Sequence, residues 1–417
     1  MKKFLLVLLI LMLGFGGYLL YTNKKEVKIP KLDIQEDVIN IDELYIYGNH
    51  LNLHGNTVDD DNLQLVLYNG GFKVYDINDI GSGFNLSDKV NEGMYLDDIP
   101  RGDYFLFLRS KKTNSSGVDE YKYYALKNTT DYKETKYYTF SNFNNMIVIN
   151  SEESYPTMMM HVSENKDDNI YDVVIDPGHG GMDGGASSGN YKETDFTMDL
   201  ALGVKEKLEK IGFKVKLTRE KDQLTKNDKL KEYGTHGRAV IPYEVKAKYL
   251  FSLHINSSTS SSVNGLEVYT AADINYDLAR SLAENITSGT GLGYSTNKIN
   301  KMYEGIYTRT FTEKDIENSL NEYEEKELKP YDISTKSNYY YIIREPGGIV
   351  TGAYVDNRNA KIIANPYVLS NVGTEAYLLE LGYISNHDNV NNLINNMDSY
   401  TSSIAKAIEP LYKKSNT

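Results

Sequence analysis

The sequence predicts an α/β domain, with a twisted, mostly parallel sheet and helices on both faces, preceded by a β-sandwich-like domain and an N-terminal transmembrane segment. Strand-like apolar runs alternate with helical periodicity over residues 171–417, which is typical of a parallel sheet covered by helices. Short alternating runs separated by turn residues fill residues 26–150. An uncharged stretch occupies most of residues 1–25. The length of 417 residues agrees with two folded domains plus a terminal segment.

The N-terminal stretch has the pattern of an export signal. Lys2 and Lys3 precede the uncharged run from Phe4 to Tyr21, and Lys24 and Lys25 follow it. The run is just long enough to span a membrane, and no Ala-x-Ala cleavage site follows it. We therefore expect an uncleaved membrane anchor that leaves the rest of the chain outside the cell. A cleaved signal peptide, which would give a secreted protein, is the alternative.

Residues 26–150 show the strand spacing of a β-sandwich-like domain. Turn signals such as Asn69-Gly70-Gly71 separate the alternating runs. The expected strands are Glu43 to Tyr47, Leu63 to Tyr68, Tyr104 to Leu108, Tyr121 to Leu126, Lys136 to Phe140 and Met146 to Asn150. The ionisable residues here form no catalytic-looking cluster, so we interpret the region as a spacer or interaction domain. Residues 151–170 are expected to form a linker to the next domain.

Composition excludes several function classes. A formal net charge of −13 argues against a nucleic-acid partner, because phosphate binding depends on clustered Lys and Arg. The absence of cysteine excludes disulfides, thiolate zinc ligands and a cysteine nucleophile, and it suits a protein that works outside the cell. Histidine is scarce, with seven residues. Five of them lie in no strand-end setting suited to a metal ligand: His50, His54, His161, His236 and His387.

Two histidines are predicted to lie at one edge of the parallel sheet. The β-branched run Val173 to Ile175 predicts a buried strand that Pro177-Gly178 ends, so His179 lies at the carboxyl end of that strand. A second strand, Tyr249 to Asn256, carries His254 near its own carboxyl end. Open α/β sheets place their ligand clefts at this edge, and the glycines around the first histidine allow the backbone to approach a ligand closely.

Two carboxylates join these histidines. Glu193 stands at the start of a helix predicted over residues 194–211, where it is either a helix cap or a ligand. Two histidines and one carboxylate form the ligand set of an open catalytic site for one Zn²⁺ ion, which favours the ligand interpretation. Glu380 ends the buried-strand run from Ala376 to Leu379, and a carboxylate in such a place is expected to act as a general acid/base.

These motifs resemble a known family. DPGHGG, the glutamate of KETD, SLHIN and LLELGYISN occur in the order found in zinc-dependent N-acetylmuramoyl-L-alanine amidases, the bacterial cell-wall enzymes with an amidase type 3 catalytic domain. The resemblance implies that His179, Glu193 and His254 bind zinc and that Glu380 is catalytic. Arg238 resembles an arginine usual in the family, and we assign it a structural role. The expected catalytic domain spans residues 171–417.

The resemblance also implies a substrate and a location. The substrate is peptidoglycan, and the bond cleaved is the amide between N-acetylmuramic acid and L-alanine. The expected role is cell-wall remodelling or daughter-cell separation at the extracytoplasmic face of the bacterial cell membrane. Two alternative functions are a non-catalytic, membrane-anchored scaffold that binds peptidoglycan, and a zinc carboxypeptidase that acts on stem peptides.

An insertion at about residues 287–366 departs from a minimal member of this family. Its first half predicts a charged helix, which is either a solvated surface helix or a lid over the zinc site. The carboxylates suited to capping the zinc are Glu313, Glu317, Glu322 and Glu324. A protein activator acting on the insertion is the corresponding expectation for a partner. The second half is predicted to form a hairpin turned by Pro346-Gly347-Gly348.

Overall fold

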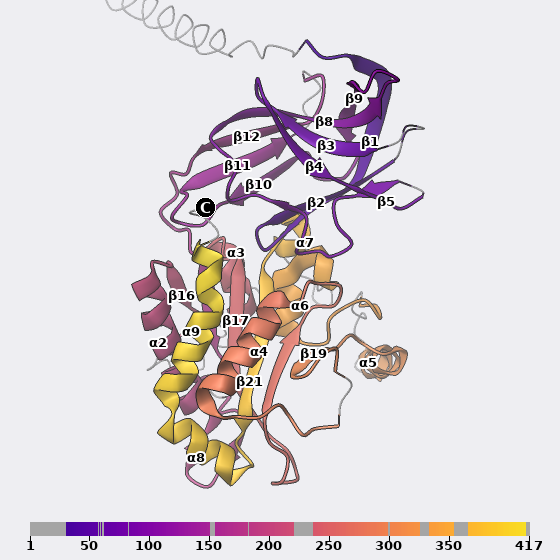
Figure 1. Cartoon of the computed structure of the whole chain (residues 1–417). Helices are drawn as coiled ribbons and strands as arrows, with labels where there is room; N and C mark the ends of the chain where they lie inside the picture. The colour runs from indigo at the N-terminus through magenta and orange to yellow at the C-terminus, as the bar shows by residue number, and fades with distance from the viewer. Residues whose placement is uncertain are drawn as a thin grey trace, which may run out of the picture.

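A computed structural model of the chain (Figure 1) places a β-rich part on top of a mixed α/β part. The described residues are 31–413, without 57, 59, 61, 82, 151–154, 182, 221–236, 299–300, 326–332 and 354–365. Among them, no helix has both the length and the apolar character needed to cross a membrane. The anchor expected at residues 1–25 and His236 lie outside the described residues.

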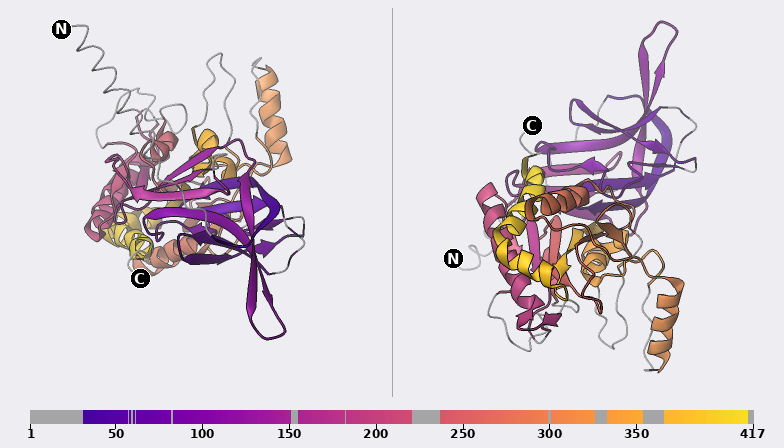
Figure 2. Two further views of the ribbon diagram at one scale, coloured as in Figure 1. Left: turned by 90° about the horizontal axis from the view of Figure 1, so that it is seen from above. Right: turned by 60° about the horizontal axis from the view of Figure 1, so that its bottom comes forward.

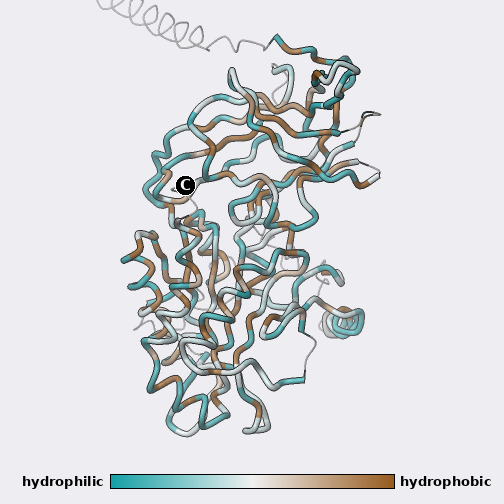
Figure 3. The backbone as a smooth tube through the Cα atoms, viewed as in Figure 1, coloured by the Kyte–Doolittle hydropathy of each residue, from teal (hydrophilic) through white to brown (hydrophobic). Residues whose placement is uncertain are grey.

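The first part of the chain forms a curved β-sheet. Its strands are β1 (Ile34–Tyr47), β2 (His50–Gly55), β3 (Leu63–Tyr68), β4 (Phe72–Asp76), β5 (Asn78–Asp79), β6 (Phe84–Asn85), β7 (Met94–Tyr95), β8 (Gly102–Thr113), β9 (Asp119–Asn128), β10 (Glu134–Tyr138), β11 (Asn145–Asn150) and β12 (Met159–Glu164). Apolar side chains from most of these strands share one core, and apolar segments run along the strands (Figure 3). The expected sandwich is not confirmed, because hydrogen bonds join all these strands into a single sheet.

The expected linker is wrong over β12. Met159 pairs with Asn150 of β11 on one side and with Phe105 of β8 on the other, so this strand lies inside the sheet. Three consecutive methionines explain the difference, because successive strand residues point to opposite faces. Met158 and Met160 enter the main core, whereas Met159 packs into a small cluster on the other face.

The second part contains a six-stranded sheet in the order β16-β13-β17-β21-β18-β19. These strands are β13 (Val173–Pro177), β16 (Val215–Leu217), β17 (Tyr249–Asn256), β18 (Leu266–Thr270), β19 (Ile306–Thr308) and β21 (Glu375–Tyr383). The first four strands in this order are parallel, and β18 runs antiparallel to β21. The predicted mostly parallel sheet is therefore confirmed. A separate two-stranded ribbon, β14 (Ser187–Ser188) and β15 (Tyr191–Lys192), precedes the first long helix.

Helices flank this second sheet. They are α2 (Glu193–Ile211), η2 (Arg238–Val240), α3 (Ile241–Glu244), α4 (Asp277–Thr290), α5 (Glu313–Glu325), α6 (Tyr341–Gly347), η3 (Gly348–Thr351), α7 (Pro366–Ser370), α8 (His387–Asn395) and α9 (Met397–Lys413). Helices α2 and α4 both pack against α9, and α6 packs against β21 (Figure 1). The hairpin predicted around Pro346 is wrong. Its residues form α6 and η3, because Ile342 and Ile343 are buried and Gly348 ends the helix with a positive φ of 66°.

One short strand from the second part joins the first sheet. Strand β20 (Val372–Gly373) pairs in parallel with Ile46 and Tyr47 of β1. Just before it, the buried side chain of Asn371 donates to the backbone oxygen of Leu44 at 2.9 Å and to the hydroxyl of Thr135 at 3.0 Å. The expected boundary at residue 171 therefore does not separate the two parts completely, because these residues lie far beyond it in the chain.

We predict that Asn371→Ala destabilises the folded chain. The change leaves two buried polar groups without their donor and places alanine at a φ of 49°, a left-handed conformation that asparagine tolerates better. We expect the free energy of unfolding to fall by about 1–3 kcal/mol, measured by denaturant unfolding. Asn395→Ala, at an exposed position of α8, is the matched control. Equal unfolding midpoints for the two variants would contradict the role assigned to this contact.

Candidate metal centre

The register of two parallel strands brings the two predicted histidines together. Pro177, the last residue of β13, pairs with Leu253 of β17, so the loop after β13 begins level with His254. The backbone of His179 then has a φ of 62°, which is uncommon for a residue with a side chain. The imidazole rings of the two histidines lie 4.8 Å apart between centroids. Both therefore lie at the carboxyl edge of the sheet, as predicted.

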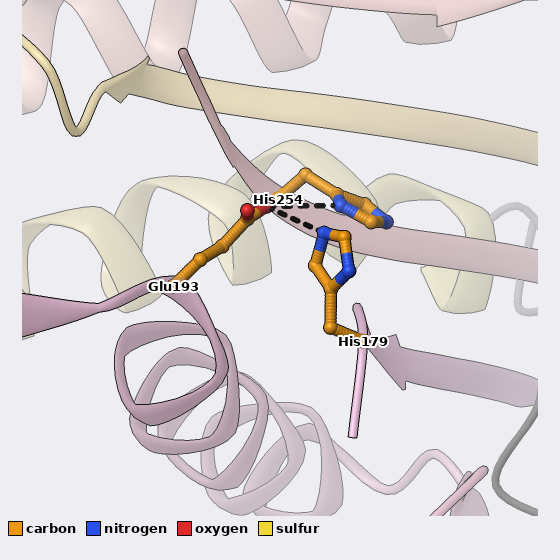
Figure 4. A group of neighbouring side chains, drawn as sticks. All are labelled: His179, Glu193 and His254. Atoms are coloured by element: carbon orange, nitrogen blue, oxygen red, sulfur yellow. Dashed lines mark hydrogen bonds and ion pairs between the residues drawn. The ribbon is translucent and has the colours of Figure 1, made fainter. Parts of the chain in front are cut away.

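Glu193 links the two histidines (Figure 4). Its Oε1 atom lies 3.1 Å from Nε2 of His179 and 3.1 Å from Nδ1 of His254. Backbone N–H groups hold the same carboxylate from two sides, since Ile255 donates to Oε1 at 2.9 Å and Ala186 donates to Oε2 at 2.8 Å. Glu193 is the first residue of α2 and is buried, as expected for a residue at the helix start. Its side chain faces the histidines rather than capping its own helix.

The loop between β13 and β14 closes tightly around this group. Gly185 has a φ of 64°, and a Cβ atom there would lie 2.7 Å from Oε2 of Glu193 and 2.7 Å from Cδ2 of His179. Only glycine fits this position without moving the two side chains. One ligand atom from each of His179, Glu193 and His254 lies within 4.8 Å of the others. Two imidazoles and one carboxylate at these separations suit a divalent metal with an open coordination position.

Two buried arginines support the loop, and only Arg238 was predicted from the sequence. Arg238 donates to Oδ1 of Asp176 at 2.7 Å, which agrees with the structural role predicted for it. Burial by itself would raise the pKa of Asp176, but Arg238 and two hydroxyl donors lower this pKa to about 2. Arg219 donates to the backbone oxygens of Pro177 and Gly178 at 2.9 and 3.2 Å. Arg219 lies two residues after the end of β16, and this position at a strand end was the available signal.

Glu380 lies on β21, beside the triad formed by His179, Glu193 and His254. It pairs in register with His254 of β17 and with Glu267 of β18, so neighbouring strands place it next to the histidine. Its Oε2 atom is buried and has no hydrogen-bond partner among the described residues. Burial raises the pKa of the Glu380 carboxyl well above its usual range, and the charges of Glu193 and Glu267 raise this pKa further. The structure thus brings all four predicted site residues to one edge of the sheet.

The charged helix predicted in the insertion is present, but it does not cover this edge. Helix α5 projects from the side of the molecule in two different views (Figure 2). Glu313, Glu317 and Glu324 are exposed, and the group of metal-ligating atoms found among the described residues includes none of them. The side chain of Glu322 lies outside the described residues. The structure therefore gives no support to capping by the three described carboxylates.

Fold and site define an α/β protein with a candidate open metal centre at the carboxyl edge of its sheet. Residues 173–410, more than half of the chain, match the Amidase_3 family, described as N-acetylmuramoyl-L-alanine amidase. The chain therefore belongs to the N-acetylmuramoyl-L-alanine amidase family.

Individual relatives match over shorter stretches. The probable cell wall amidase LytH of Staphylococcus saprophyticus is 35% identical over 118 residues, which cover 27% of this chain and 36% of that protein. The germination-specific N-acetylmuramoyl-L-alanine amidase of Bacillus subtilis is 32% identical over 103 residues, covering 23% of this chain and 44% of that protein. The chain thus matches less than half of either relative's length.

Among solved structures, the catalytic domain of CwlV, an N-acetylmuramoyl-L-alanine amidase from Bacillus (Paenibacillus) polymyxa var. colistinus, is 22% identical. The match has a TM-score of 0.38 and covers 58% of this chain and 99% of that domain.

We predict that Gly185→Ala disrupts metal binding whereas Gly184→Ala does not. A methyl group at position 185 meets two members of the triad, but a Cβ atom at position 184 meets no atom within 4 Å. We expect zinc affinity to fall at least about tenfold for Gly185→Ala, since misplacing the groups around a metal typically costs that much. Competition with a chromophoric chelator measures the affinity. Equal zinc affinity for the two variants would show that the close approach at position 185 is unimportant.

Proposed function

We propose that this chain is a zinc-dependent hydrolase that cleaves the amide bond between N-acetylmuramic acid and L-alanine in peptidoglycan. The main support is the convergence of His179, Glu193 and His254, with Glu380 on the neighbouring strand. The substrate and the bond cleaved follow from membership of the amidase family. The proposed biological role is cell-wall remodelling or daughter-cell separation.

The three ligand residues suit a single Zn²⁺ ion. His179 and Glu193 present Nε2 and Oε1 to each other, and His254 presents Nδ1 to the same carboxylate oxygen. When bound, zinc polarises the substrate carbonyl and lowers the pKa of a coordinated water. The chain itself supplies three ligand side chains and leaves a further coordination position open. The backbone donors of Ala186 and Ile255 fix the carboxylate between the two rings.

Glu380 is proposed to move the proton. Its buried Oε2 accepts no hydrogen bond from the described residues, so this oxygen is available to a proton. Burial and two nearby carboxylates raise the pKa of Glu380, which makes its carboxylate a stronger base. As general base it takes a proton from the attacking water, and as general acid it delivers this proton to the departing nitrogen of L-alanine.

Anchoring and activation belong to the same proposal. An N-terminal anchor at residues 1–25 would hold the enzyme at the extracytoplasmic face of the cell membrane, close to its substrate. A protein activator acting on residues 287–366 also stays a prediction.

A digestion of purified sacculi tests this function. We expect the full chain to release intact stem peptides with a free L-alanine amine, and a zinc chelator to abolish the release, both measured by mass spectrometry. Release of terminal amino acids instead would identify a carboxypeptidase. Binding to sacculi without any release would favour the scaffold.

We predict that Glu380→Gln slows hydrolysis about 10²- to 10⁴-fold, because the amide cannot transfer the proton. Zinc content, measured by atomic absorption, should stay at the wild-type level, since Glu380 is not among the proposed ligands. Glu284→Gln, an exposed change on α4, is the control and should leave the rate unchanged. An unaltered rate in the Glu380 variant would remove this residue from the mechanism.

A further inference from the structure

A second carboxylate contacts the first histidine on the side away from the triad. The Oδ2 atom of Asp183 lies 2.9 Å from Nδ1 of His179, while Nε2 of the same ring faces Glu193. The two ring nitrogens therefore face two different carboxylates. Asp183 was not predicted as a site residue from the sequence; it stands four residues after the histidine in the same loop.

The loop itself holds Asp183 in place. Gly185 donates its backbone N–H to Oδ1 of Asp183 at 3.1 Å, and the backbones of Gly180 and Asp183 exchange two hydrogen bonds of 2.8 and 3.1 Å. The side chain is nevertheless 67% exposed, so its position comes from these bonds and not from packing. Because both oxygens of this exposed carboxylate make hydrogen bonds, the carboxylate has a defined orientation toward the imidazole.

The chemistry of histidine explains how this contact can affect metal binding. A neutral imidazole has one N–H donor and one acceptor nitrogen, and only the acceptor can bind a metal. An N–H bond from one nitrogen to a carboxylate leaves the lone pair on the other nitrogen and makes that nitrogen more basic. In His179, a bond from Nδ1–H to Asp183 leaves the lone pair on Nε2, the atom that faces the triad.

The other histidine is held differently. Within the described part of the chain, Nδ1 of His254 faces Glu193 and no side chain bonds its Nε2. Close packing restrains this ring instead, since a Cβ atom at Gly178 would lie 2.4 Å from its Cε1. Among the described residues, contact with a carboxylate outside the triad is therefore a property of His179 and not of His254.

We propose that Asp183 is a positioning residue for the metal centre, which fixes the tautomer and the orientation of His179 so that Nε2 binds zinc. This inference rests on the proposed function, because it requires the triad to hold zinc. Asp183 itself lies outside the triad and contacts the metal only through His179. Removing it should weaken the hold on zinc while leaving all three ligands in the chain.

Zinc affinity of the full chain tests the proposal through a readout independent of hydrolysis. Competition with a chromophoric chelator gives the affinity of wild type, Asp183→Asn and Asp183→Ala. We expect Asp183→Ala to lose about 10- to 100-fold, as is typical when the carboxylate behind a metal-bound histidine is removed. Asparagine keeps an acceptor oxygen without the charge, so Asp183→Asn should lie between the two. Asp195→Ala, which removes an exposed carboxylate in the first turn of α2, should bind zinc like wild type.

The thermal midpoint of the metal-free variants separates positioning from loop stability. Equal midpoints with the graded loss of affinity would support the proposal. Wild-type affinity in both Asp183 variants would overturn it and leave the proposed function intact. A loss of affinity in Asp183→Ala that is matched by a lower metal-free midpoint, with wild-type affinity in Asp183→Asn, would overturn it in favour of a loop-stabilising role. A wild-type chain that binds no zinc would overturn the proposed function together with this inference.

Discussion

The carboxylate of Glu193 is the contact on which the candidate centre depends. It accepts backbone N–H groups from the loop after β13 and from β17, and it faces both histidines at 3.1 Å. A buried carboxylate is costly unless hydrogen bonds and positive or metal partners compensate it. Here the compensation comes from three segments at once. The start of α2, the glycine-rich loop and the end of β17 are therefore fixed relative to one another by one functional group.

The register of the surrounding strands determines which side chains lie next to one another in the candidate centre. His254 and Glu380 pair directly across β17 and β21, so a shift by one residue in either strand would move one of them to the opposite face. The neighbouring pair of Leu253 and Leu379 opposes such a shift, because both side chains are fully buried. The packing of the core thus fixes the strand register, and the register in turn fixes the positions of the polar residues at the strand ends.

Much of this arrangement could be predicted from sequence because its signals are local. The β-branched run before Pro177 and the strand carrying His254 have short, unambiguous patterns. Contacts between distant segments left weaker signals. The hydrogen bond between His179 and Asp183 depends on a loop that contains residues in left-handed conformations, and α6 forms where a proline and two glycines suggested a hairpin turn. Strand β12 was missed because the methionines at its start, Met158 to Met160, are buried in clusters on opposite faces, a feature of tertiary packing.

The pairing of β20 with β1 bears on how such a chain can evolve. A domain joined by a linker can be exchanged, duplicated or lost without cost to its neighbour. Here the polypeptide returns from the second part to complete the first sheet, and then continues directly into the strand that carries Glu380. Asn371 and the hydroxyl of Tyr132 add side-chain bonds across the same boundary. We therefore expect the two parts to be exchanged as one unit, because recombination at the junction near residue 171 would separate β1 from a strand with which it pairs.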